Sequence, residues 1–403
     1  MKNLSRKEFL RTSALAAAGS LLVPRFLKAL ESPNRLGRGD TVLVVIQLGG
    51  GNDGLNTVVN FRNDLYYQAR PQIAIPTSEV IRLNDEQGLH PALAPLRAHF
   101  DQGELAIFNS VGYPNPDRSH FRSMDIWQTA SRADEYLSTG WIGRYLDANC
   151  AGLPRPTGAI QVSDHLDLVL KGEQIKGLAV SDPARFHRTA ASPWFRAISE
   201  AHQHAHADHS QADYLYKTLA SSISSAEYIH ETSRIAQGKA DYPVNPLAKR
   251  LRTAAGFIRS GLDTRVYYVD TSGFDTHVNQ KAQHQRLLEV YAASVDAFVQ
   301  DLKAGGCWQD VCILTFSEFG RRVQQNASGG TDHGTANNLF VLGGGLKKSG
   351  LMNAAPNLAD LDGGDLKFQV DFRQIYAELL THWLKADPQK VLKGSYPSLG
   401  MFG

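Results

Sequence analysis

The chain has 403 residues, with 42 lysines and arginines against 40 aspartates and glutamates, a formal net charge of +2 and 42% hydrophobic residues. This composition is typical of a globular protein. It excludes a disordered chain, a collagen-like chain and a strongly basic nucleic-acid-binding protein, so we expect no nucleic acid among the partners. The 3 cysteines are too few for a disulfide framework. A chain of this length can instead be stabilised by a large hydrophobic core.

Residues 1–38 have the pattern of an export signal followed by a linker. The stretch SRKEFLR at residues 5–11 resembles the twin-arginine export motif, with Lys7 in place of the second arginine. The apolar run from Ala14 to Val23 is too short to span a bilayer and has the length of a signal-peptide core. We therefore expect a periplasmic or secreted protein that uses the twin-arginine export machinery. No clear cleavage site follows, and an uncleaved signal would anchor the protein to the membrane. The alternative is an amphipathic first helix of the fold.

Residues 39–403 are predicted to form one α/β domain. Buried strands are indicated by apolar runs at residues 41–48, 105–109, 265–270, 311–316 and 338–342. Helical patterns lie between them, including residues 90–100, 280–303 and 371–384. Strands that alternate with helices predict a doubly wound, mostly parallel sheet. The polar, alanine- and serine-rich stretch from about 193 to 237 is predicted to be a helical insertion in this domain.

Ionisable and polar side chains gather next to the ends of these predicted strands. Ligands of doubly wound sheets bind at the carboxyl ends of strands, so these side chains would converge if the strands are parallel neighbours. Carboxylates and imidazoles that converge fit a divalent cation such as zinc, manganese or magnesium. The candidates are Asn52 and Asp53, Ser119 and His120, Asp275 and His277, Glu318, and Asp332 and His333.

Each of these positions also has a purely structural interpretation. The glycines at 49–51 lack the spacing of a dinucleotide-binding or P-loop motif, so they favour a sharp turn under a ligand. Asp275 is also suited to cap the helix predicted from residue 280. Glu318 is also suited to pair with an arginine. Ser119 is predicted to cap the helical segment 120–130, a position that is compatible with a role as activated nucleophile.

Five motifs in the same order make the chain resemble the exported domain-of-unknown-function family 1501. They are GGNDG at 50–54, RSHF at 118–121, GFDTH at 273–277, SEFGR at 317–321 and GTDHG at 330–334. That family is similar to a branch of the alkaline phosphatase and sulfatase superfamily. The resemblance therefore implies an alkaline-phosphatase-like fold with a metal site at the strand ends.

The resemblance also implies roles for individual residues. The metal ligands would be Asn52, Asp53, Asp275, His277, Glu318, Asp332 and His333, and the nucleophile would be Ser119, flanked by Arg118 and His120. Phe319 stands where the superfamily has a histidine ligand, and a phenylalanine cannot bind a cation. Either His120 or Asp332 would then supply the missing ligand, or only one metal would bind. Pro114 occupies the position that sulfatases convert to formylglycine, which argues against a formylglycine sulfatase.

These observations predict an exported, metal-dependent hydrolase of phosphate or sulfate esters. The cation would be zinc, manganese, magnesium or calcium, and Ser119 would attack the ester or position a water that attacks. Arg118 or Arg321 would hold the anionic group of a small-molecule or envelope-glycan ester. Because of Phe319, the alternative is a non-catalytic exported binding protein with a degenerate metal site. A third hypothesis is group transfer onto an envelope glycan.

Overall fold

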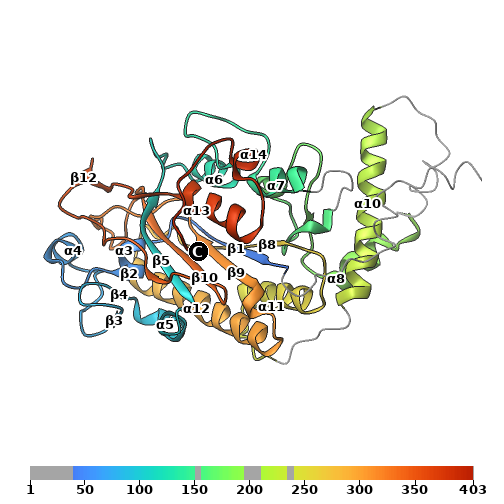
Figure 1. Ribbon diagram of the computed structural model, residues 1–403. Coiled ribbons are helices and arrows are strands. Elements are labelled where there is room, and N and C mark those ends of the chain that lie inside the picture. Colours follow the sequence, from blue (N-terminus) through green and yellow to red (C-terminus); the bar gives the residue numbers. More distant parts are fainter. Residues whose placement is uncertain (1–39, 150–155, 195–209, 234–239, 403) are drawn as a thin grey trace, which may run out of the picture.

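The computed structural model describes residues 40–149, 156–194, 210–233 and 240–402 (Figure 1). The predicted export signal at residues 1–38 lies outside these ranges. Within the described ranges, no helix combines the length and the apolar character that a membrane span requires.

The described residues form a nine-stranded central sheet in the order β11-β5-β10-β9-β1-β8-β6-β7, with β14 also paired to β5. The five strands predicted from the sequence are confirmed as β1 (Val42–Gly49), β5 (Leu105–Gly112), β8 (Val266–Ser272), β9 (Val311–Phe316) and β10 (Asn337–Gly343). The short strands β6 (Ala159–Gln161), β7 (Leu178–Ala179), β11 (Gly350–Leu351) and β14 (Val370–Asp371) extend the sheet.

The direction of β10 decides where the candidate residues lie. Strand β1 runs parallel to both of its neighbours, β8 and β9, whereas β10 runs antiparallel to β9 and to β5. The predicted mostly parallel sheet is therefore confirmed. Because β10 is reversed, the residues that precede it lie at the same edge as the residues that follow β1, β8 and β9. Asp332 and His333 reach this edge for that reason.

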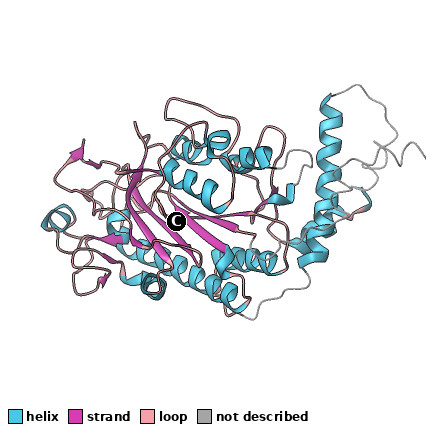
Figure 2. Cartoon of the chain, in the orientation of Figure 1, coloured by secondary structure: helices cyan, strands magenta, loops and turns pink. Residues whose placement is uncertain are grey.

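Helices cover both faces of the sheet, as a doubly wound fold requires (Figure 2). Alternate residues of β1 point to opposite faces, so Leu43 belongs to one hydrophobic cluster and Val44 to the other. The first cluster includes residues of α6 (His120–Thr129), α7 (Trp141–Asn149), α13 (Phe372–Glu378) and α14 (Pro388–Leu392). The second includes residues of α5 (Ala94–Asp101), α11 (Pro246–Arg259) and α12 (Gln280–Ala304).

Smaller elements surround this core. The short strands β2 (Val58–Val59), β4 (Gly88–Leu89) and β3 (Ile81–Arg82) form a separate sheet, next to α3 (Gly54–Thr57) and α4 (Asp64–Ala69). Strands β12 (Leu361–Asp362) and β13 (Asp365–Leu366) form a hairpin. The predicted helix at 90–100 begins with a 3₁₀ turn, Pro91–Leu93, and the predicted helix at 371–384 ends with a π-helical turn, Leu379–Trp383.

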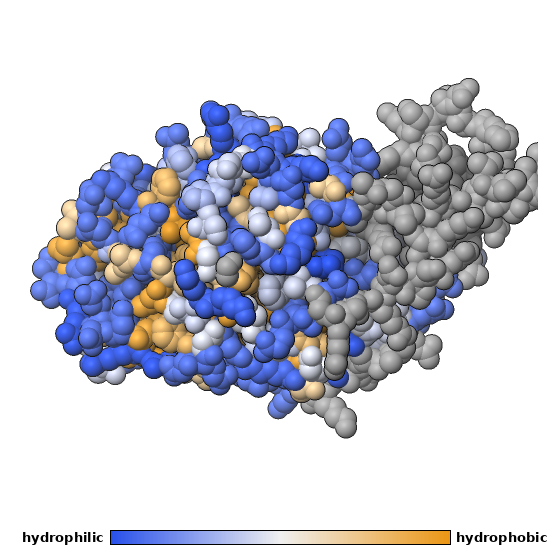
Figure 3. All heavy atoms as spheres, viewed as in Figure 1, coloured by the Kyte–Doolittle hydropathy of each residue, from blue (hydrophilic) through white to orange (hydrophobic). Residues whose placement is uncertain are grey.

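Helix α10 (Ser210–Ser233) falls within the predicted insertion and lies at the periphery, beside α8 (Pro183–Ala190) (Figure 1). The extent of the insertion stays a prediction, since residues 195–209 and 234–239 are outside the described ranges. On the face of the molecule shown in Figure 3, hydrophilic residues predominate and apolar areas are small. This agrees with the position of the apolar helix faces against the sheet.

Candidate metal centre

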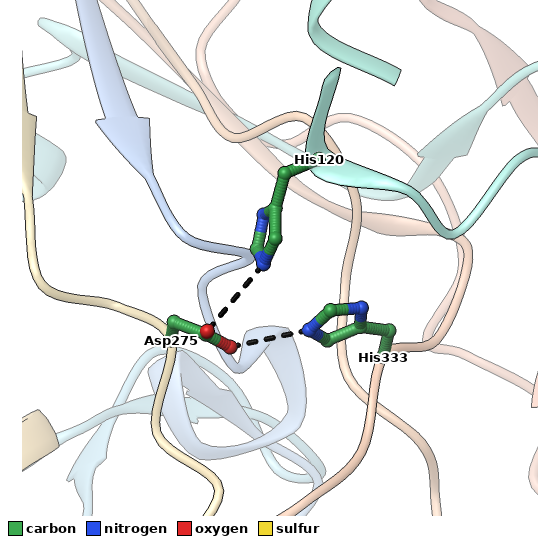
Figure 4. Close-up of side chains that lie close together, drawn as sticks. All are labelled: His120, Asp275 and His333. Carbon is green, nitrogen blue, oxygen red and sulfur yellow. Dashed lines mark hydrogen bonds and ion pairs between the residues drawn. The ribbon is translucent and has the colours of Figure 1, made fainter. Parts of the chain in front are cut away.

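His120, Asp275 and His333 meet at the edge of the sheet where β1, β8 and β9 end (Figure 4). His120 is the first residue of α6, Asp275 follows β8, and His333 precedes β10. The Nε2 atom of His333 lies 3.2 Å from Oδ1 of Asp275, and the Nε2 atom of His120 lies 3.5 Å from Oδ2. One ligand atom from each residue lies within 4.8 Å of the others, so the three side chains have the spacing needed to share a metal ion.

His277 is a further imidazole at the same carboxylate. Its Nε2 atom lies 3.0 Å from Oδ1 of Asp275 and 3.0 Å from Nε2 of His333. Three Nε2 atoms, from His120, His277 and His333, therefore surround the carboxylate of Asp275. The sequence predicted Asp275, His277 and His333 as ligands but assigned His120 to the catalytic group.

The other ring nitrogen of each histidine faces an acceptor. The Nδ1–H of His120 donates to Oε1 of Glu318 at 2.9 Å, and the Nδ1–H of His333 donates to the backbone carbonyl of Arg118 at 2.8 Å. Nδ1 of His277 lies 3.4 Å from Oδ1 of Asp332. Because a carbonyl or a carboxylate can only accept, these contacts place a proton at Nδ1, and a ring that carries no second proton presents a lone pair at Nε2.

These contacts fix the rings in the tautomer that binds a cation. The Nε2 atom of His120 is buried and has no hydrogen-bond partner in the described part of the chain. Imidazoles that bind metals commonly donate their second N–H to a carboxylate or carbonyl, as these rings do. The donor set, with its orphaned nitrogen, therefore fits a bound divalent cation.

Asp275 is held in its ionised form. Burial raises the pKa of its carboxyl, but hydrogen bonds from Arg321 and His333 outweigh this effect and lower the pKa to about 2. In the opposite sense, the hydrogen bond to Glu318 raises the pKa of His120. The centre thus combines a permanent negative charge with imidazoles that are polarised by carboxylates and carbonyls.

Arg321 contacts Asp275 from the interior of the protein. Its guanidinium group is completely buried and donates to Oδ1 of Asp275 at 2.7 Å. It also donates to the backbone carbonyls of Gly50, Gly51, Thr331 and Phe274. These contacts engage all three nitrogens of the guanidinium group. Arg321 is therefore placed to position Asp275 and the turn after β1, whereas the sequence led us to expect that it binds the anionic group of a substrate.

Glu318 differs from the prediction that it is a metal ligand. The residue is 1% exposed, and its Oε1 accepts hydrogen bonds from the Gly50 backbone and from His120. Its Oε2 lies 3.2 Å from the hydroxyl of Ser317, whose shorter hydrogen bond, at 2.6 Å, goes to the backbone carbonyl of Leu48. Oε1 is thus engaged with the protein, and the carboxylate orients His120. Asp332 has the equivalent position behind His277.

Phe319 packs against two of the imidazoles. Its ring centroid lies 4.9 Å from that of His120 and 4.7 Å from that of His333. The ring also explains a glycine in the first motif: a Cβ atom at Gly51 would lie 2.3 Å from Phe319, and the φ of Gly51 is +76°. Phe319 therefore acts as an apolar wall that restricts the orientation of His120 and His333.

Asn52 and Asp53, also predicted as ligands, lie in a separate buried network. Asp53 forms an ion pair with Arg70 at 2.6 Å and accepts a hydrogen bond from Gln280. Burial raises the pKa of Asp53, but Arg70 outweighs it and holds the pKa below its usual range. Oδ1 of Asn52 accepts a hydrogen bond from His284 at 2.9 Å. The network joins the turn after β1 to α12.

Ser119 and Arg118 border the centre at the start of α6. Ser119 is the N-cap residue of this helix and is exposed, and its hydroxyl makes no capping hydrogen bond. Arg118 pairs with Asp365 at 2.7 Å, while its side chain remains 46% exposed. Both side chains are accessible from solvent and next to His120.

The fold and the side-chain cluster define an α/β protein that carries a histidine- and carboxylate-rich centre at the edge of a mostly parallel sheet. Residues 40–395 match the family described as protein of unknown function DUF1501, and the chain belongs to this family. Comparison with curated proteins found no match.

The fold is similar to several solved structures. The C-terminal periplasmic domain of EptC from Escherichia coli, crystallised with zinc, is 11% identical, with 76% of this chain and 73% of that chain covered and a TM-score of 0.36. A sulfatase from Pseudoalteromonas sp. is 11% identical, with 82% of this chain and 66% of that chain covered and a TM-score of 0.33. A protein in the alkaline phosphatase superfamily from Vibrio parahaemolyticus is 11% identical, with 79% of this chain and 67% of that chain covered and a TM-score of 0.31.

Proposed function

We propose that the protein binds one divalent cation through Nε2 of His120, His277 and His333 and the carboxylate of Asp275. One observation carries this proposal: three imidazole nitrogens surround a single ionised carboxylate, and each ring has an acceptor behind it at Nδ1. Nitrogen-rich donor sets of this kind favour zinc or manganese over calcium, which takes six to eight oxygen ligands. Asn52 and Asp53 are left out of the site because Arg70, Gln280 and His284 engage them.

The activity that we propose for this centre is hydrolysis of a phosphate or sulfate ester. A divalent cation bound here would stabilise negative charge on the ester oxygens and favour deprotonation of an attacking hydroxyl. Ser119 supplies that hydroxyl: it is exposed, it adjoins His120, and it lies at the N-terminus of α6, where the helix dipole favours negative charge.

In the proposed reaction, Oγ of Ser119 loses its proton and forms a bond to phosphorus or sulfur, and the bond to the leaving alcohol breaks. The alcohol oxygen takes up a proton as it departs. Water then cleaves the serine ester, which releases phosphate or sulfate and restores the hydroxyl. Arg118 is next to Ser119 and exposed, so it is the side chain placed to contact the anionic group.

The proposed location is the periplasm or the exterior of the cell, with export by the twin-arginine machinery, and it depends on the pattern of residues 1–38. An anionic ester of an envelope glycan or a small molecule would be the substrate.

A second candidate is a non-catalytic protein that binds one cation. Phe319 favours it, because a phenylalanine supplies no ligand for a second cation, and Oδ2 of Asp53 is held in an ion pair with Arg70. Hydrolysis by a single cation and a serine remains the first proposal because the hydroxyl of Ser119 is accessible beside the centre.

Turnover of p-nitrophenyl phosphate, bis-p-nitrophenyl phosphate and p-nitrophenyl sulfate tests the hydrolase proposal, with zinc, manganese or magnesium added. We expect turnover by the parent and by His165→Ala, which alters a histidine outside the centre that is 62% exposed. We expect loss of turnover in Asp275→Asn and a large fall in kcat in Ser119→Ala. Turnover that survives in both of these variants would overturn the hydrolase proposal. A bound cation with no turnover of any ester would favour the non-catalytic protein.

A further inference from the structure

A cavity of about 560 Å³ adjoins the candidate metal centre. Its wall includes Glu318 and Phe319, which also contact His120, so the cavity and the centre share these two residues. The loop after β5 contributes Arg118, and the β12–β13 hairpin contributes Asp365. A substrate whose anionic group lay at the metal centre would therefore have room for its alcohol portion in this cavity.

Asp365 is an acceptor with unused capacity in the cavity wall. The residue is 1% exposed, and neither carboxylate oxygen accepts a hydrogen bond from the described residues. Arg118 Nη2 lies 2.7 Å from Oδ2, and Arg322 Nε lies 3.4 Å from Oδ1. These two ion pairs offset the charge but lack hydrogen-bonding geometry. The carboxylate therefore has lone pairs for a donor from a ligand.

Trp127 adds an unused donor. It lines the same cavity, and its indole Nε1 is buried without a hydrogen-bond partner among the described residues. Its ring is fixed by stacking on Phe316 and Phe372, with centroids at 4.9 Å and 4.2 Å. Phe368, which is 38% exposed, adds a further aromatic surface. Beneath the cavity surface there are thus an acceptor and a donor, each atom with less than 1 Å² of accessible area, and beside them apolar ring faces; a ligand reaches the two polar atoms when side chains of the wall move.

A hydroxyl group is both a donor and an acceptor, so it can satisfy Asp365 and Trp127. A ring with several hydroxyls also presents C–H groups that pack on aromatic side chains. An acyl chain would leave the buried carboxylate and indole unpaired, which is unfavourable. The charged residues that line the cavity have both signs, Asp117, Asp362 and Asp365 together with Arg118 and Lys367.

We propose that this cavity binds the sugar ring of the substrate, so that the ester hydrolysed at the metal centre is a phosphorylated or sulfated sugar. Asp365 accepts a hydrogen bond from one ring hydroxyl, and Trp127 Nε1 donates to another hydroxyl oxygen. This inference rests on the proposed function. It adds a specificity site that is separate from the metal ligands.

The first test compares two ester substrates in variants that leave the metal ligands intact. Asp365→Asn weakens the acceptor, and Trp127→Phe removes the indole donor while it keeps an aromatic ring. For N-acetylglucosamine 6-sulfate and glucose 6-phosphate, we expect kcat/KM to fall by about tenfold or more in each variant. In Trp127→Phe the small p-nitrophenyl esters should be hydrolysed as by the parent; Asp365→Asn is left out of this comparison because Asp365 pairs with Arg118, the side chain proposed to contact the anionic group. The control is Asp101→Asn, which alters an exposed aspartate that pairs with Arg97, and neither residue lines the cavity. An equal loss on sugar and p-nitrophenyl esters in Trp127→Phe would overturn the sugar site.

A second test does not depend on turnover. Saturation-transfer difference NMR with the methyl glycosides of glucose, galactose and N-acetylglucosamine measures binding of the sugar ring alone. We expect ring-proton signals with the parent and Asp101→Asn, and weaker signals with Asp365→Asn and Trp127→Phe. Absence of signals for all three glycosides, or equal signals in the parent and both cavity variants, would overturn the sugar site. Failure of the hydrolase proposal would appear instead as absence of turnover of every ester.

Discussion

The Nε2 atoms of His277 and His333 lie 3.0 Å apart, and both face the same oxygen of Asp275. Two lone pairs at this distance repel each other, so a proton or a cation at one or both of these nitrogens is needed. A shared proton would satisfy this pair but would leave the Nε2 of His120 without a partner. A divalent cation held by His120, Asp275 and His333, whose ligand atoms lie within 4.8 Å of one another, would also give that nitrogen a partner, which is why we favour it.

Glu318→Gln should weaken metal binding without unfolding the protein. The amide can still accept from His120 and from the Gly50 backbone, but the charge that polarises the imidazole is lost. Loss of such an outer partner typically reduces metal affinity by roughly 10- to 100-fold. Competition with a chromogenic zinc chelator measures the affinity.

Asp332→Asn provides the matched control for that experiment, because Asp332 is more exposed and lies 3.4 Å from its histidine. We expect a smaller loss of affinity in this variant. An unchanged affinity in Glu318→Gln would show that His120 does not bind the cation.

Asp53→Asn should destabilise the fold and leave the cation in place. The substitution removes the charge that neutralises Arg70, and both side chains are completely buried. Breaking a buried ion pair on one side typically costs about 3–5 kcal/mol in the free energy of unfolding. Urea denaturation measures the stability, and elemental analysis of the folded variant measures the metal. Loss of the metal from a folded Asp53→Asn protein would restore Asp53 as a ligand.

The buried histidines should make the metal-free protein sensitive to acid. Burial lowers the pKa of His284 to about 3 and that of His90 to about 4, against 6.5 for an unperturbed histidine. A lowered pKa means that the unfolded chain binds protons more readily than the native protein. Stability is therefore full above about pH 6.5 and falls as the pH drops towards the folded values, by about 1.4 kcal/mol per pH unit for each histidine.

Urea denaturation in EDTA, from about pH 7 to about pH 5, measures this dependence. We expect a shallower loss of stability in His284→Gln, because glutamine does not titrate. The same pH dependence in the parent and in this variant would mean that His284 is not buried as a neutral ring.

The sequence alone was sufficient to predict the main strands. Continuous β-branched runs such as 41–48 identify strands that are buried on both faces, and the structure brings the predicted residues Asp275, His277 and His333 together. The assembly depends on β10, however, because only an antiparallel strand brings the preceding His333 to this edge. Hydrophobic pattern does not encode strand direction.

The roles of individual carboxylates were harder to predict because they depend on distant partners. Glu318 orients His120, a residue 198 positions earlier in the chain, and Arg321 supports Asp275, 46 positions earlier. Asp53 follows a strand as a metal ligand would, yet it faces Arg70. Residue type and position relative to a strand end were the available signals, and they do not distinguish a ligand from a residue that positions a ligand.

Metal content measured by elemental analysis tests the central claim most directly, on protein purified without chelators and after incubation with zinc or manganese. We predict one tightly bound ion per chain in the parent and in His165→Ala, and none in folded His333→Ala or Asp275→Asn. A parent protein that retains no metal after removal of excess ions would contradict the account. Retention of the ion in both His333→Ala and Asp275→Asn would contradict it equally.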